Sequence, residues 1–211
     1  MDTLLWAVTN YRAMAESPDA IDELPIVDGS IHGGASFAVG YLVTLVLVVV
    51  AESEQLTNDL FEGAGWVYYN AHFADVELRA PRGFETVDVE TTSINYLTGQ
   101  GPEGMEIAAT ELPPVVYHAV PVVVLLVFGF LLANKVGAGS PADGAKAGAS
   151  LVFGVAILAL GGTYLFELGE VIGPNRPQGV LLVGILFPLV FGALGGVLAS
   201  RVDVRIFPWD E

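Results

Sequence analysis

The side chains best suited to chemistry in this sequence are one histidine and a few polar groups beside long apolar runs. His118 lies near the start of one run, Glu52 directly follows an earlier one, and Tyr164, Glu167 and Glu170 close a later one. Glu167 and Glu170 are three residues apart, so a helix would place them on one face. If these groups converge with His118, imidazole and carboxylate could bind a divalent cation or transfer protons.

A purely structural role is the alternative for the same residues. Residues at helix ends are commonly solvated, and one hydrogen bond satisfies a histidine at a membrane boundary. His32 and His72 match no recognised ligand spacing, and we expect both on the surface. The sequence also has no cysteine and no HExxH, phosphate-loop, nucleophile-elbow or dinucleotide motif. We therefore expect no metal site, no cofactor and no catalytic residue.

Four apolar runs must position these groups, and they cover residues 33–51, 114–133, 147–166 and 179–199. Each approaches the ~20 residues that an α-helix needs to cross a ~30 Å hydrocarbon layer. The 211 residues are 53% hydrophobic with a mean hydropathy of +0.60, which suits a single helical membrane domain. We predict an all-α membrane protein, folded as a bundle of four transmembrane helices in the cell membrane. The lipid bilayer is then one of its partners.

The segments between the spans differ in length and character. We expect an amphipathic segment and linker at 1–32, a loop domain at 52–113, short loops at 134–146 and 167–178, and a tail at 200–211. Glycines and prolines between residues 16 and 34 favour the linker assignment. Lysines and arginines near the spans place both termini in the cytoplasm and the loop domain outside.

Acidic residues dominate the segments outside the four apolar runs. The chain has 24 Asp and Glu against 8 Lys and Arg, for a net charge of −16. Such a surface repels nucleic acid, so we expect no nucleic-acid partner. The composition also suits a halophilic source, although acidic loops can act as a solubilising surface in any organism.

The outer loop contains an aromatic run and an alternating segment. The run Trp66–Tyr69 and the alternation over residues 84–91 are strand signals, and Ala80–Gly83 resembles a turn. They predict a hairpin over 66–79 and 84–91, and hence an acidic, mixed α/β extracellular loop domain. An aromatic belt at the membrane surface is the alternative. In either case we expect four aromatics to dock onto helix ends or to anchor the loop to headgroups or to the bundle: Trp66, Tyr68, Tyr69 and Phe73.

Small residues within the spans suggest close helix packing, although glycine is also simply frequent in membrane helices, and prolines within the spans suggest kinks. Small residues four apart let helix backbones approach, and we expect this at Ser36 with Gly40, Ser150 with Gly154, and Gly192 with Gly196. Pro121 and Pro188 each remove one backbone hydrogen bond and favour a kink, which serves either shape or gating.

Three segments together resemble an uncharacterised family of halophilic archaeal membrane proteins, a domain of unknown function sometimes labelled as transporters. They are Val39–Thr44 in the first span, Gly65–Phe73 in the loop and Phe187–Gly196 in the last span. The resemblance implies four helices and an outer loop, with no reaction and no ligand attached.

Three functional interpretations remain. Abundant packing glycine and an aromatic loop favour a non-enzymatic scaffold or accessory subunit, which would meet a membrane-protein or cell-surface partner or self-associate. The alternative is a small transporter or ion-conducting protein that uses His118 and the outer carboxylates. A membrane enzyme at the outer boundary is a third interpretation, but the sequence offers it no nucleophile.

Overall fold

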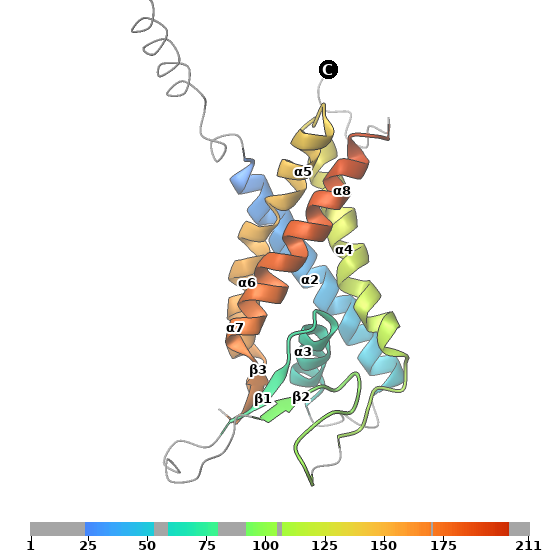
Figure 1. The fold of residues 1–211 in the computed structure, drawn as a ribbon, viewed down its shortest axis with the longest axis vertical. Helices are drawn as coiled ribbons and strands as arrows, with labels where there is room; N and C mark the ends of the chain where they lie inside the picture. Colours follow the sequence, from blue (N-terminus) through green and yellow to red (C-terminus); the bar gives the residue numbers. More distant parts are fainter. Residues whose placement is uncertain (1–23, 53–58, 80–91, 105–106, 170, 203–211) are drawn as a thin grey trace, which may run out of the picture.

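The fold comes from a computed structural model that describes residues 24–52, 59–79, 92–104, 107–169 and 171–202. Four helical rods run side by side along its long axis, and each is long and apolar enough to cross a membrane (Figure 1). They are α2 (Ile26–Ala51), α4 (Pro114–Lys135), α5 with α6 (Pro141–Ala149 and Val152–Leu165), and α7, η1, η2 and α8 (Arg176–Gln178, Gly179–Leu186, Pro188–Gly192 and Ala193–Ala199). The prediction of four helices that are long and apolar enough to span a membrane is confirmed.

Two helices begin well before their apolar runs. The first starts at Ile26, so residues 26–34 are helical and the predicted linker is wrong there. Gly29 and Gly33 are not flexible joints, because they let α2 approach the backbones of Ser150 and Leu151 closely. The third rod starts at Pro141, inside the predicted loop 134–146, where Ser140 accepts a hydrogen bond from the Asp143 amide as an N-cap.

The third and fourth rods depart from regular α-helix. The third is interrupted at Ser150 and Leu151, between α5 and α6. The fourth contains two π-helical segments, and Pro188 begins the second of them. A π turn accommodates the amide that proline lacks. Pro121 lies inside α4.

Small residues lie where helices approach closely. Gly148 and Gly144 of the third rod face Gly192 and Gly196 of the fourth, backbone against backbone. Gly154 meets the carbonyl of Ser30 in α2. Ser36 and Ser150 are buried and donate to carbonyls of their own helices, while Gly40 lies against the Tyr68 ring. These contacts leave no room for larger side chains.

A short helix and a small sheet close one end of the bundle, which we call the sheet end. The helix is α3 (Leu60–Ala71), and the strands are β1 (Val76–Leu78), β2 (Thr92–Ile94) and β3 (Ile172–Pro174). The strands are antiparallel in the order β2-β1-β3, so both inter-span segments at this end share one sheet (Figure 1). The first described helix begins, and the last one ends, at the opposite end, the terminal end.

The predicted hairpin is wrong in its first half. The aromatic run Trp66–Tyr69 lies in α3, and only residues 76–78 of the predicted 66–79 strand are extended. β1 pairs with Thr92–Ile94 and with Ile172–Pro174. The predicted second strand, 84–91, and the turn Ala80–Gly83 lie outside the described residues. The aromatic run is helical because the bundle buries it on every side. This burial overrides the local preference for a strand.

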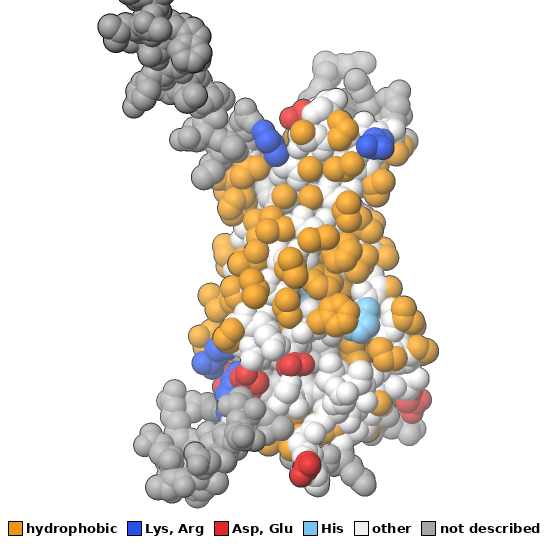
Figure 2. All heavy atoms as spheres, in the orientation of Figure 1, with side chains coloured by type: hydrophobic (Ala, Val, Ile, Leu, Met, Phe, Trp, Pro, Cys, Tyr) orange, Lys and Arg blue, Asp and Glu red, His pale blue; other side chains and the backbone are white. Residues whose placement is uncertain are grey.

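Apolar side chains cover the middle of the face shown in Figure 2. Together with the exposed hydrophobic residues of the other rods they form what we call the apolar belt. Large hydrophobic residues are exposed on every rod, including Val46 in α2, Val123 in α4, Ile157 in α6 and Leu181 in η1. A soluble domain rarely exposes such a continuous apolar surface, which a bilayer would cover.

Candidate functional site

The buried helix α3 is the most unusual element of the fold. Every residue from Gly63 to Ala71 is buried. Three glycines on three different rods make room for its rings, since Gly40 lies against Tyr68, and Gly162 and Gly179 lie against Tyr69. The helix therefore occupies space among the rods rather than lying on their ends.

Hydrogen bonds and aromatic contacts tie α3 to the rods. The Trp66 indole N–H donates to the carbonyl of Phe166 at 2.7 Å, and the Tyr69 hydroxyl donates to the carbonyl of Ala159. The Tyr68 ring packs edge-on against Phe37 at 5.2 Å between centroids. Tyr68 and Tyr69 therefore contact helix interiors, whereas Trp66 contacts the end of α6. Phe73 is 62% exposed.

The end of α3 satisfies some of its backbone carbonyls with a tight turn. The last carbonyls of any helix lack intrahelical partners, which is costly away from water. The carbonyl of Tyr69 accepts from the amides of His72 and Ala74, at 2.9 and 3.1 Å. The carbonyl of Asn70 accepts from the Phe73 amide at 2.9 Å.

Two histidines satisfy the remaining carbonyls. His72 Nδ1 lies 2.8 Å from the carbonyl oxygen of Tyr68, and His118 Nδ1 lies 2.9 Å from that of Ala71. A carbonyl only accepts, so each Nδ1 carries the proton. His118 thus bridges α4 to the end of α3, which is a structural role for the residue first considered for cation binding.

His72 is 1% exposed, so the prediction that it lies on the surface is wrong. Its ring lies among Tyr68, Phe187 and the backbone, with centroid distances of 4.7 Å to Tyr68 and 4.8 Å to Phe187. Burial lowers the pKa of His72 from 6.5 to about 4, and the neighbouring His118 adds to this effect. His32, from a half-buried position, makes the same contact with the carbonyl four residues earlier.

Acidification is expected to destabilise the protein through His72. The unfolded histidine gains a proton as pH falls below 6.5, while the folded one resists protonation until about 4. The free energy of unfolding should therefore fall by ~1.4 kcal/mol per pH unit across this window. His72→Asn, which keeps a donor near Tyr68, should flatten this dependence in detergent melts between pH 7 and 5, and His32→Asn should not. Equal pH dependence in all three proteins would contradict the assignment.

Glu52 anchors the segment that leads into α4. Its side chain accepts from the amide of Glu111 at 2.9 Å and from the Tyr117 hydroxyl at 2.8 Å, and it is 1% exposed. A third donor is the amide of Leu112, at 3.3 Å. The carboxylate is therefore occupied by structural hydrogen bonds.

Glu52→Gln is expected to lower the free energy of unfolding by about 2 kcal/mol. Its NH₂ group would face amide and hydroxyl donors, whereas the carboxylate accepts from all of them. Glu103→Gln, at an exposed position, is the matched control and should melt like the native protein. A native-like melt of Glu52→Gln would show that the anchor is dispensable.

Glu167 belongs to a separate network at the sheet end. It forms ion pairs with Arg79 and Arg176, both at 2.8 Å. The Arg176 guanidinium also lies over the Tyr164 ring, 4.4 Å from its centroid. Arg79 further donates to the carbonyl of Pro174, so the network joins β1, β3 and the two rods beside them.

The structure thus divides the predicted cluster. Glu52 bonds to the segment before α4, Glu167 bonds to two arginines, and His118 bonds to α3. Tyr164 is 56% exposed, and Glu170 lies outside the described residues. Across the described ranges, no group of three or more His, Asp or Glu is placed to hold a metal ion.

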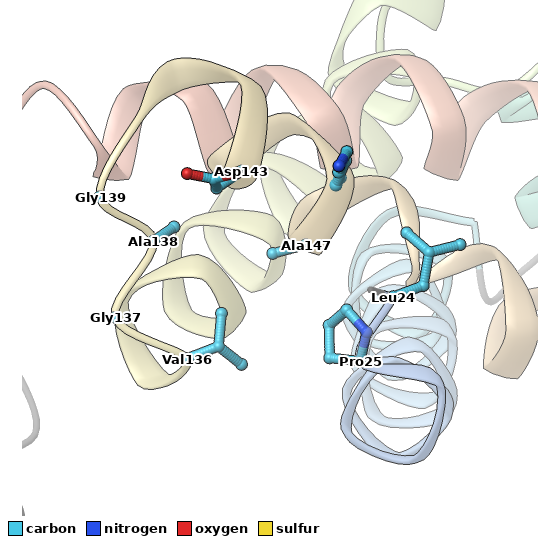
Figure 3. A pocket seen from close by; sticks show the side chains of 9 residues that line it. Leu24, Pro25, Val136, Gly137, Ala138, Gly139, Asp143 and Ala147 are labelled. Atoms are coloured by element: carbon cyan, nitrogen blue, oxygen red, sulfur yellow. The ribbon is translucent and has the colours of Figure 1, made fainter. Parts of the chain in front are cut away.

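A cavity of about 410 Å³ lies at the terminal end of the bundle. Figure 3 shows it from close by. Its walls come from the start of α2, the turn after α4, and α5 (Leu24, Pro25, Val136, Gly137, Ala138, Gly139, Asp143, Lys146 and Ala147). The Asp143 carboxylate accepts from the Ser140 hydroxyl at 2.6 Å. The lining combines apolar side chains with the charged side chains of Asp143 and Lys146.

Comparison with known proteins places the chain in a family without assigning an activity. No curated protein and no solved structure matches it. A family model matches residues 9–203, which is nearly the whole chain. The protein belongs to DUF7978, a family of unknown function.

Proposed function

We propose that this protein is a non-enzymatic scaffold or accessory subunit of a membrane assembly. Its binding surface would be the platform, which we define as β1, β2, β3 and residues 95–104. The packing of α3 supports this most directly. Residues Gly63–Ala71 of α3 are all buried, and the helix is hydrogen-bonded to α6 and to the residue that follows α6, which would make the base of the platform rigid. A rigid base lowers the entropic cost of binding a partner.

Polar groups inside the rods are consistent with a structural role. Buried hydroxyls of Ser36, Thr44, Ser150 and Thr163 donate to carbonyls of their own helices. A transport pathway usually needs polar groups that face a water-filled route or one another.

The platform would face the outside of the cell. Lys135 ends α4, Lys146 lies in α5 and Arg201 follows α8, so all three lie near the terminal end of the bundle. Positive residues of this kind favour the cytoplasmic side. We therefore propose that both termini are cytoplasmic.

One observation favours the alternative, a small transporter. In transporters, helices that end inside the membrane often hold ions or protons at their ends. Here α3 ends beside His72 and His118. Against this, the histidine rings themselves occupy the carbonyls that an ion would need.

Site-specific photo-crosslinking in native membranes separates the two functions. Two variants carry a photoreactive residue at Thr98 or at Glu103, both exposed on the platform. Each should yield one discrete adduct, and the two adducts should have the same mass. The same residue at Val46 or Ile157, exposed in the apolar belt, is the control and should not yield it. Proton or cation flux through liposomes carrying the purified protein, lost in His118→Ala, would overturn the scaffold proposal in favour of transport.

A further inference from the structure

The corner where the chain leaves α3 presents an aromatic ring to the surroundings. Phe73 is the one non-glycine residue of the described chain with a positive φ, at 62°, and its side chain is 62% exposed. This backbone conformation is unfavourable for a phenylalanine, so the fold holds it there at a cost. The ring stacks on His118, with centroids 4.4 Å apart and an interplanar angle of 17°.

His118 carries an unused hydrogen-bond acceptor at this corner. Its Nδ1 donates to the carbonyl of Ala71, so Nε2 of the neutral ring has a lone pair. Among the residues that the structure describes, none donates a hydrogen bond to Nε2. The side chain is half-buried, so a molecule from the surroundings can reach it.

The depth of this corner in the membrane restricts which molecules can reach His118. Val115 and Val116 lie nearer the start of α4 and are 69% and 36% exposed, so apolar surface continues past His118 toward the sheet end. A group at His118 therefore lies below the level of phospholipid headgroups. A small ring carrying a hydroxyl on an apolar tail suits this depth.

We propose that Phe73 and His118 bind a lipid-soluble phenol or quinol. Its hydroxyl would donate to His118 Nε2, its ring would pack against the exposed edge of Phe73, and its tail would lie in the apolar belt. The site does not depend on the scaffold function, because it lies on the side of the bundle and not on the platform.

Equilibrium binding of decylubiquinol tests the proposal. The full chain would be placed in phosphatidylcholine nanodiscs under anaerobic conditions, with empty nanodiscs to correct for partitioning. We expect saturable one-site binding. Decylubiquinone, which has no hydroxyl to donate, should bind about 10-fold more weakly, as expected for the loss of one hydrogen bond.

Variants assign the binding to the corner. His118→Phe keeps the stacked ring but removes the acceptor, and we expect about 10-fold weaker quinol binding. Phe73→Leu alters an exposed side chain, and about 5-fold weaker binding is expected from the lost ring contact. Leu186→Ala, 47% exposed in the belt, is the matched control and should bind like the native protein.

Three results would overturn the proposal. The first is equal binding of quinol and quinone. The second is displacement of the quinol by equimolar phosphatidylglycerol, which would assign the corner to lipid headgroups. The third is unchanged binding by Phe73→Leu. If His118→Phe does not fold, two results still test the proposal. They are the ratio of quinol affinity to quinone affinity in the native protein and the quinol affinity of Phe73→Leu.

Discussion

Gly192→Leu is expected to lower the free energy of unfolding by about 3 kcal/mol. A Cβ atom on Gly192 would lie 2.4 Å from the carbonyl oxygen of Gly148, and one on Gly148 would lie 1.9 Å from that of Gly192. The obstacle is backbone on both sides, so no side chain can move aside and the helices must separate. Unfolding in detergent by increasing denaturant measures the effect.

Gly161→Leu provides the control for this prediction. Gly161 also lies in a membrane rod, but no atom lies within 4 Å of the position that its Cβ would take. Glycine also weakens a helix, so this variant should match or slightly exceed the native stability. If Gly192→Leu and Gly161→Leu unfold alike, close backbone packing does not hold the bundle together.

Tyr69→Ala is expected to have the largest effect, a loss of about 4 kcal/mol. Tyr69 is 0% exposed and its hydroxyl donates to the carbonyl of Ala159. Its ring fills the space left by Gly162 and Gly179, so truncation opens a cavity between α3 and two rods. The same detergent unfolding experiment reports the change.

Two further variants help to assign the loss of stability in Tyr69→Ala to the buried ring. Tyr69→Phe keeps the ring and removes only the hydroxyl, so it should cost about 1 kcal/mol. Tyr164→Ala removes an exposed tyrosine and should cost less than Tyr69→Ala. Similar losses for Tyr69→Ala and Tyr164→Ala would mean that α3 does not support the bundle.

The sequence was sufficient to predict the four rods. Runs of about 20 apolar residues have few alternatives in a membrane protein. Their ends were less predictable, because Gly29, Gly33 and Pro141 have the composition of a loop and yet lie in helices. The packing surface opposite each glycine decides its role, and that surface belongs to another rod.

The helix α3 was missed for a related reason. A helix buried on all sides has no polar face, so it lacks the periodicity that distinguishes a surface helix from a strand. Gly63 and Gly65 also lower its local helix propensity. In the fold, Gly65 is needed because its position faces the Phe166 ring.

The side-chain networks required three-dimensional information. Glu52 and Tyr117, and likewise Arg79 and Glu167, are far apart in sequence and joined only by the packing of α4 and the sheet. His118 lies within an apolar run, and a titratable side chain at that depth needs a partner. We expected carboxylates as partners, whereas the partner is a helix carbonyl.

Spin labelling in a bilayer tests most directly whether α3 enters the membrane. The chain has no cysteine, so a single cysteine can carry a nitroxide at Phe73, Thr98 or Ile157. Oxygen reaches labels in the hydrocarbon, and a water-soluble nickel chelate reaches those outside. We predict that the label at Phe73 behaves like that at Ile157, accessible to oxygen and protected from nickel. A label at Phe73 that behaves like the one at Thr98 would place the end of α3 in water and contradict the account.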